Sequence, residues 1–212
     1  MIHKFGFCSY FSKLNDYDFE LDLINFLINT NDKAIPEKLR WYRPPERIYK
    51  KLSNNEAAQR SKRIQLRRPF RSTYRNVNDK RITVKGVSID MIKDLNKIFP
   101  LDLDSRFWKD KKSFFNSGYG SVVYLDGELA SICYSAAIFN GIAEIDIYSR
   151  TSLRKRGLAK IAAKSFINQC YEKNIIPNWD CFQNNIPSVF IAKSLGFKVV
   201  NEYSFYTIYR NK

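Results

Sequence analysis

The chain has 212 residues, of which 44% are hydrophobic and 15% aromatic, and its formal net charge is +15. This composition is sufficient for a packed core and excludes a globally disordered chain. No apolar run approaches the ~18 residues that a membrane-spanning helix needs. The first residues also lack the apolar core and cleavage site of a signal peptide, so we expect a cytoplasmic protein.

Histidine and cysteine usage narrows the chemistry. His3 is the single histidine, so a Ser-His-Asp triad or a His-rich zinc site is not expected, and we predict no metal. The four cysteines contain no Cys-x-x-Cys pair and are predicted to be reduced, buried thiols: Cys8, Cys133, Cys170 and Cys181.

The positive charge is concentrated in one segment. Residues 38–85 carry 16 Lys and Arg against three acidic residues, whereas residues 1–37 carry three against six. Aromatic residues are interleaved with these cations, a composition compatible with RNA or tRNA binding. Alternatively, the aromatics form the core of an N-terminal subdomain with solvated charges, or the segment attracts an acidic cofactor or substrate.

The first half of the chain gives few clear elements. The sequence predicts a helix over 18–28, a second helix from Glu46 after Pro44-Pro45 to roughly Arg63, and a third that Ser88 caps. Residues 67–84 show no clear period.

The second half is more regular. Strands are predicted over 119–125 and 128–139 and after residue 141, joined by the hairpin dipeptides Asp126-Gly127 and Asn140-Gly141. A helix beginning near Gly157 and a strand over 175–182 follow, and the strand must return parallel to the third. A helix that Pro187 opens and Gly196 closes comes next, and residues 197–210 are predicted to form a hairpin or a bent strand pair.

The loop between the third strand and its helix carries three cations, Arg154, Lys155 and Arg156, before Gly157 and Ala159. Backbone N–H groups at a helix start bind anions, and glycine lets a phosphate approach the backbone. The pattern Arg-x-x-Gly-x-Ala is short, so an ordinary solvated basic turn remains an alternative.

The order of these elements, together with Asn185-Ile-Pro-Ser188 and Leu195-Gly196-Phe197, resembles the GCN5-related N-acetyltransferases over about residues 112–209. Details are similar to the zwittermicin-resistance type branch. The resemblance implies an α/β (α+β) fold: a mixed, mostly antiparallel sheet with a splayed parallel strand pair and flanking helices, plus a basic N-terminal helical region. It divides the chain into an N-terminal, substrate-side region, 1–111, and an acetyl-CoA-binding domain, 112–212.

The resemblance also implies acetyl-CoA as acetyl donor. Its pyrophosphate would contact the loop and helix start from Arg154 through Leu158 to Ala159, and its pantetheine arm would pair with the strand that contains Ile147 and Tyr148. Asn185 and Ser188 would lie near the pantetheine or the leaving thiolate.

Acetyl transfer to an amine needs a base, because free amines are mostly protonated at neutral pH. In the family a glutamate on this strand often draws the proton through water, so Glu144 is the first candidate and Asp146 the second. Alternatively, either carboxylate holds the basic loop by ion pairing. The position of the family's usual tyrosine acid is Ala192, which leaves Tyr203, Tyr206, Ser188 or water.

The predicted function is an acetyl-CoA-dependent N-acetyltransferase that acts on a primary amine of a small molecule or peptide. The alternatives are an RNA-binding acetyltransferase acting on aminoacyl-tRNA, and a non-catalytic protein on the same scaffold that binds coenzyme A or nucleic acid.

Overall fold

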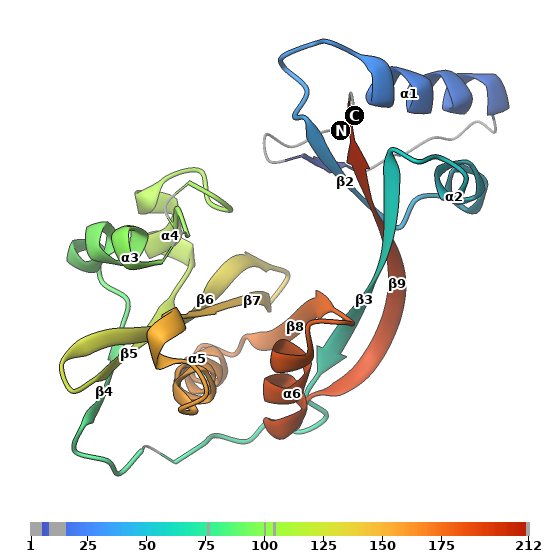
Figure 1. Ribbon diagram of the computed structural model, residues 1–212. Coiled ribbons are helices and arrows are strands. Elements are labelled where there is room, and N and C mark those ends of the chain that lie inside the picture. Colours follow the sequence, from blue (N-terminus) through green and yellow to red (C-terminus); the bar gives the residue numbers. More distant parts are fainter. Residues whose placement is uncertain (1–5, 9–15, 76, 100, 104, 211–212) are drawn as a thin grey trace. The chain divides into compact units, whose positions relative to one another are not determined.

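The computed structural model describes residues 6–8, 16–75, 77–99, 101–103 and 105–210, and the chain divides into two compact units (Figure 1). Unit 1 is formed by residues 1–64, 182–184 and 201–212, and unit 2 by residues 65–181 and 185–200. His3 lies outside the described residues. The division into 1–111 and 112–212 stays a prediction about function.

Unit 1 contains the strands β1 (Phe7–Cys8), β2 (Lys38–Tyr42) and most of β3 (Ala58–Arg67), together with the end of β9 (Lys198–Tyr209). The strand order is β1-β2-β9-β3. The helices α1 (Tyr17–Asn29) and α2 (Glu46–Ser53) pack on alternate residues of β2 and β9, including Trp41 and Tyr206. One face of this small sheet therefore forms the core of unit 1.

The predicted helix from Glu46 to Arg63 is wrong beyond Ser53. Asn54 ends α2, the Asn55 side chain accepts a hydrogen bond from the Ala57 N–H at 2.9 Å, and β3 begins at Ala58. The apolar stripe of a longer helix would have been thin, and pairing within the sheet outweighs helix propensity here.

Unit 2 is built on five strands in the order β8-β7-β6-β5-β4. They are β4 (Ile82–Gly86), β5 (Gly120–Leu125), β6 (Glu128–Phe139), β7 (Ile142–Ser149) and β8 (Ile176–Phe182). Neighbours pair antiparallel from β4 to β7, and β7 pairs with β8 in parallel. The predicted mixed sheet with one parallel crossover is confirmed.

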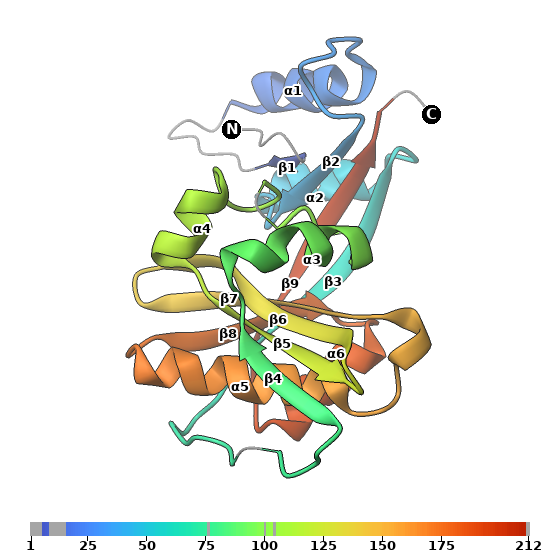
Figure 2. The ribbon, with the colours of Figure 1, turned by 90° about the vertical axis from the view of Figure 1, so that its left-hand side faces the viewer.

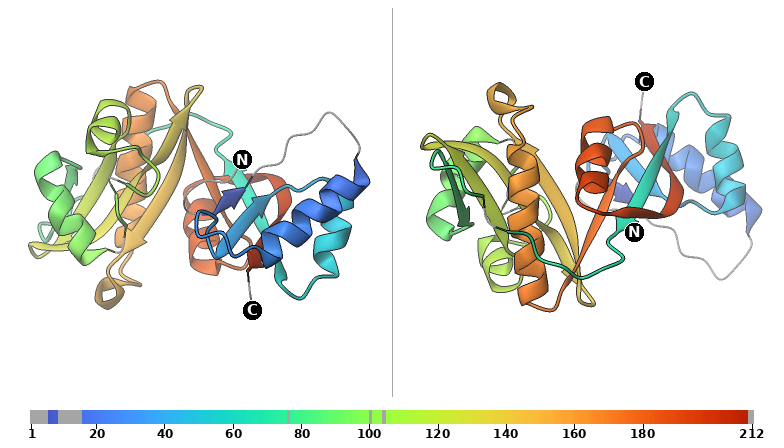
Figure 3. Two further views of the ribbon diagram at one scale, coloured as in Figure 1. Left: turned by 90° about the horizontal axis from the view of Figure 1, so that it is seen from above. Right: turned by 90° about the horizontal axis from the view of Figure 1, so that it is seen from below.

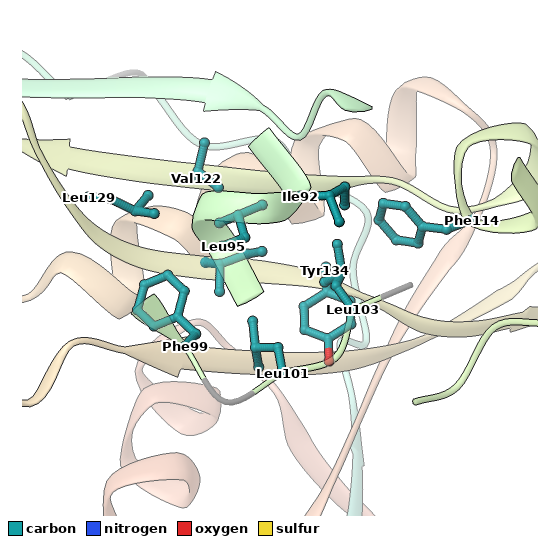
Figure 4. Packing of buried hydrophobic residues seen from close by; sticks show 10 residues of the cluster. Ile92, Leu95, Phe99, Leu101, Leu103, Phe114, Val122, Leu129 and Tyr134 are labelled. Carbon is teal, nitrogen blue, oxygen red and sulfur yellow. The ribbon is translucent and has the colours of Figure 1, made fainter. Parts of the chain in front are cut away.

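Helices cover both faces of this sheet. The short helices α3 (Ile92–Ile98, after the 3-10 turn η1, Ile89–Met91) and α4 (Lys111–Ser117) lie on one face, and α5 (Leu158–Glu172) lies on the other (Figures 2 and 3). The last helix is α6 (Ile186–Ser194). A cluster of fully buried residues joins α3 and α4 to the strands (Figure 4): Ile92, Leu95, Phe99, Phe114, Val122, Ile132 and Tyr134.

The hairpin predictions and the C-terminal glycine predicted for α6 are confirmed in this unit, whereas Ser88 precedes the 3-10 turn η1 and makes no side-chain cap hydrogen bond. Asp126 and Asn140 both have positive φ, as do the glycines after them, which matches the tight turns that these dipeptides favour. Gly196 has φ 78° just after α6. The hairpin or bent strand pair predicted over 197–210 is wrong, because β9 is one continuous strand from Lys198 to Tyr209.

All four cysteines are free and buried, as predicted. Burial raises the pKa of the Cys8 thiol to about 11 and that of the Cys170 thiol to about 12. Both side chains are therefore neutral thiols at physiological pH.

Candidate active site

The parallel strands β7 and β8 separate part-way along their length. They pair from Ile142–Ile176 to Glu144–Asn178, and the pairing ends there although β7 continues to Ser149 and β8 to Phe182. A register shift in β6 between Ser135 and Ala137 lies opposite the same point of β7. Residues 145–149 of β7 thus pair with β6 on one side and have separated from β8 on the other.

The loop that follows β7 forms a helix start with exposed backbone and exposed cations. After the 3-10 turn η2 (Thr151–Leu153), Arg154, Lys155, Arg156 and Gly157 are all exposed. Gly157 is the residue before α5, has φ 78°, and makes no side-chain cap, while an added Cβ there would meet nothing within 4 Å. The first turn of α5 therefore presents N–H groups and positive charge to solvent, an arrangement suited to a phosphate.

The side chain of Arg154 packs back on β7. Its Nε donates to the Ser149 carbonyl at 3.3 Å, and its guanidinium lies 5.9 Å from the Tyr148 ring centroid. The Tyr148 ring in turn packs against Phe99, with 5.6 Å between centroids. These contacts link the basic loop to the separated part of β7.

Glu144 is the last residue of β7 that pairs with β8, and its side chain is half-buried. Both of its carboxylate oxygens accept from Nδ2 of the fully buried Asn178, at 2.9 and 2.8 Å. Asn178 Oδ1 accepts in turn from Arg67 Nε at 3.4 Å. The carboxylate is thus oriented by the residue that faces it across the parallel pair.

Asp146 is held by different partners, all from unit 2. Its Oδ2 accepts from the Tyr134 hydroxyl at 2.6 Å and lies 3.8 Å from Arg106 Nη1, and its Oδ1 accepts from the Ile147 N–H at 3.0 Å. Burial, and then the nearby Asp146 charge, raise the pKa of Tyr134, so its hydroxyl stays protonated and donates. Side chains two residues apart on a strand project from the same face, so Asp146 lies on the same face of β7 as Glu144.

The other predicted residues have well-defined local roles. Asn185 is the N-cap of α6 and accepts from the Ser188 N–H at 3.3 Å, while Ser188 Oγ accepts from Trp179 Nε1 at 3.0 Å. Ala192 is fully buried within α6. In unit 1, Tyr203 packs against Tyr42 and under the Arg43 guanidinium, which is 4.5 Å from its ring centroid.

Tyr206, another acid candidate, is buried in the core of unit 1. Its hydroxyl is 2.6 Å from Ser53 Oγ, and burial raises its pKa. Such a phenol is a structural residue of that core.

Comparison with known proteins identifies the scaffold. A sequence profile of GNAT acetyltransferases matches residues 6–206. The chain belongs to the GNAT acetyltransferase family. The chain is 38% identical over 100 residues to the uncharacterized N-acetyltransferase YdfB of Bacillus subtilis (strain 168). That match covers 47% of this chain and only 38% of YdfB.

Solved GNAT structures share the fold. A GCN5-related N-acetyltransferase-like protein from Streptococcus suis 89/1591 superposes with a TM-score of 0.68 at 20% identity, covering 89% of this chain and 75% of that one. A putative GNAT-family acetyltransferase from Novosphingobium aromaticivorans gives a TM-score of 0.57 at 14% identity over 82% and 74% of the two chains. The GNAT prediction is confirmed, and the zwittermicin-resistance branch stays a prediction.

This GNAT chain shows two further features within its described part. None of its helices combines the length and the apolar character needed to cross a bilayer. The same residues contain no group of three or more His, Cys, Asp and Glu side chains placed to hold a metal ion.

Part of the basic segment over 38–85 has a structural role. Arg68 donates to the Ser72 carbonyl at 2.8 Å and to the Tyr171 hydroxyl at 3.1 Å, and Arg71 donates to the Asn174 side chain at 2.8 Å. Tyr74 exchanges hydrogen bonds of 2.8 and 2.9 Å with the Asn168 side chain. We call residues 68–74 the anchoring segment, because they attach this part of the chain along α5.

Sequence reasoning missed three residues that complete the site: Asn178 on β8, Tyr134 on β6 and Arg106. Asn178 and Tyr134 belong to strands that were predicted, and each lies directly opposite its carboxylate in the sheet. The predicted strand pairings would have placed them there once the register was known, whereas nothing in the sequence signals Arg106.

Proposed function

We propose that this protein is an acetyl-CoA-dependent N-acetyltransferase that acetylates a primary amine of a small molecule or a peptide. One observation carries the proposal: β7 separates from β8 at the half-buried Glu144, and the same strand leads into an exposed, cationic helix start. A carboxylate at one end of the separated part of β7 and a cationic helix start at the other suit a long thioester carrier whose arm is attached to a diphosphate.

The residues present fit acetyl-CoA. The N–H groups at the start of α5, with Lys155 and Arg156, would hold its diphosphate, since helix N-termini and cations both stabilise phosphate. The free edge of β7 at Ile147 and Tyr148 would pair with its amide-bearing arm. When bound, acetyl-CoA supplies the activated acetyl group.

The chain's own contribution is to position the acceptor amine and to remove its proton. An α-amine has a pKa of ~8 and a lysine side chain ~10.4, so a base raises the fraction of reactive amine at neutral pH. We assign this role to Glu144, whose oxygens Asn178 orients at the point of strand separation. Asp146, held by Tyr134, is the second candidate.

Proton donation to the departing thiolate is a smaller requirement. A thiol has a pKa of ~8.5, so the thiolate leaves without a strong acid. Ala192 has no proton to give, whereas Ser188 Oγ accepts from Trp179 and keeps its own O–H to donate. Ser188 or water is therefore our candidate donor.

The experiment compares Glu144→Gln with Asp146→Asn, two isosteric changes that each remove a charge. Glu144→Gln is expected to lower kcat by about 10²–10⁴-fold, the usual contribution of a general base, and to remove the acid limb of the pH–rate profile. Asp146→Asn is expected to keep that limb.

Acetyl-CoA should raise the thermal midpoint of the wild type and of both variants equally, which separates binding from chemistry. No thermal shift of the wild type with millimolar acetyl-CoA, or no thioester consumption with any amine of a broad panel, would refute the proposal. If only Asp146→Asn lost the acid limb, Asp146 would be the general base in place of Glu144.

A further inference from the structure

A row of apolar side chains lies beside Glu144 on the same face of the sheet of unit 2. Phe139 is opposite Ile142 in the β6–β7 pair, and Ile142 is opposite Ile176 in the β7–β8 pair. Directly opposite residues project from the same face, with side chains about 5 Å apart. The three residues thus form a continuous cross-strand row, which we call the apolar row.

The apolar row is open to solvent. Phe139 is 76% exposed and Ile176 51% exposed, and Ile142 between them is half-buried. Ala137, which is opposite Glu144, is exposed as well. Exposed large apolar side chains that are contiguous indicate a surface that binds something.

The position of the row relates it to the candidate base. Side chains two residues apart on a strand project from the same face, about 7 Å apart. Ile142 therefore neighbours Glu144, and Ile176 neighbours Asn178, which orients the Glu144 carboxylate. The surface thus combines a carboxylate with an adjacent apolar strip.

We infer that the apolar row binds the non-reacting part of the acceptor, and that the acceptor is a primary amine with an apolar chain or ring next to its amino group. The carboxylate attracts the ammonium head and the row removes the apolar tail from water, so the two parts of the surface are complementary to the two parts of such a molecule. This inference rests on the proposed function, because it takes Glu144 as the place where the amine reacts.

The test measures kcat/KM for a series of straight-chain amines from propylamine to hexylamine. Full burial of one methylene corresponds to about a fourfold gain, so contact with one open face should give roughly twofold per methylene and about eightfold across the series. Phe139→Ser and Ile176→Thr are expected to flatten this dependence, with a larger loss of kcat/KM for hexylamine than for propylamine.

The matched control is Phe190→Ser on α6. Phe190 is 70% exposed and lies outside the row, so the same change in surface chemistry should leave the chain-length dependence intact. Equal kcat/KM for all the amines in the wild type, or equal flattening by Phe190→Ser, would overturn the inference. The two substituted residues of the row, Phe139 and Ile176, are both exposed, and the thermal midpoint of each variant verifies that it folds.

Two further readouts separate the possible failures. Binding of hexylamine without acetyl-CoA is followed by saturation-transfer NMR. Binding that Phe139→Ser abolishes, in a protein that acetylates no amine, would support the apolar site and refute the proposed transferase activity. If light scattering shows a dimer that Phe139→Ser dissociates, the row is a contact between two copies of the chain and the inference falls.

Discussion

Two basic segments of unit 2 have similar compositions and different structural roles. In the loop before α5, Lys155 and Arg156 are exposed at a helix start. In the anchoring segment, Arg68 and Arg71 are bonded to Ser72, Tyr171 and Asn174 and also lie over the ring of Tyr171. The comparison teaches that clustered positive charge indicates a ligand site only where the cations are exposed and are not used for hydrogen bonding or packing within the protein.

The contrast bears on the RNA hypothesis. It was based on cations and aromatic rings over 38–85, yet Arg68, Arg71 and Tyr74 pair with α5, and Arg60 lies over the Tyr49 ring at 4.5 Å. Much of the interleaving is thus cation–π packing within the protein. RNA binding stays a prediction without structural support.

The largest expected effect comes from reversing charge in the loop. Lys155→Glu with Arg156→Glu should weaken acetyl-CoA binding by about 100-fold, or roughly tenfold for each reversed charge–phosphate interaction. The unfolding midpoint without ligand should stay unchanged, since both residues are exposed. Isothermal titration calorimetry at low salt measures the affinity.

The control for this variant is Lys109→Glu with Lys112→Glu, which alters the net charge equally at two other exposed positions of unit 2. Long-range attraction alone would weaken binding equally in both double variants. That result would contradict direct contact between the loop and the phosphate groups of the cofactor.

The anchoring segment should respond in the opposite way. Arg68→Ala with Arg71→Ala is expected to lower the free energy of unfolding by about 2 kcal/mol, because several hydrogen bonds, one of them part-buried, and two contacts with the Tyr171 ring are lost together. Acetyl-CoA affinity should stay within about twofold. Urea denaturation and calorimetry on the same protein give both values.

Arg75→Ala serves as the comparison, since Arg75 is exposed just after the anchoring segment and its replacement should change stability by less than about 0.5 kcal/mol. If Arg68→Ala with Arg71→Ala kept full stability but lost cofactor affinity, the distinction between the two basic segments would be wrong.

The smallest effect is expected at Gly157. Gly157→Ala should lower the free energy of unfolding by about 1 kcal/mol, because a left-handed backbone is unfavourable for residues with a Cβ. Steric contact does not contribute, since nothing lies within 4 Å of the added atom. Gly157→Asn should cost less, since asparagine tolerates this conformation. Equal destabilisation by the two would indicate crowding in place of backbone strain.

Local patterns in the sequence were sufficient for much of unit 2. Hairpin dipeptides and the crossover helix predicted β5, β6, β7, α5 and β8. These signals depend on residues close together in the chain. The same reasoning failed for β3, where a charged segment with a weak helical pattern became a strand because it pairs within the sheet.

The sequence by itself determined the family, the order of elements in the second half and the basic loop before α5, since each depends on short-range spacing. Only the tertiary structure decided that Asn178 orients Glu144, that Tyr134 and Arg106 hold Asp146, and that Arg68 and Arg71 donate hydrogen bonds to Tyr171 and Asn174. These contacts join residues from 12 to more than 100 positions apart. Sheet register and packing bring them together, and neither can be read from local periodicity.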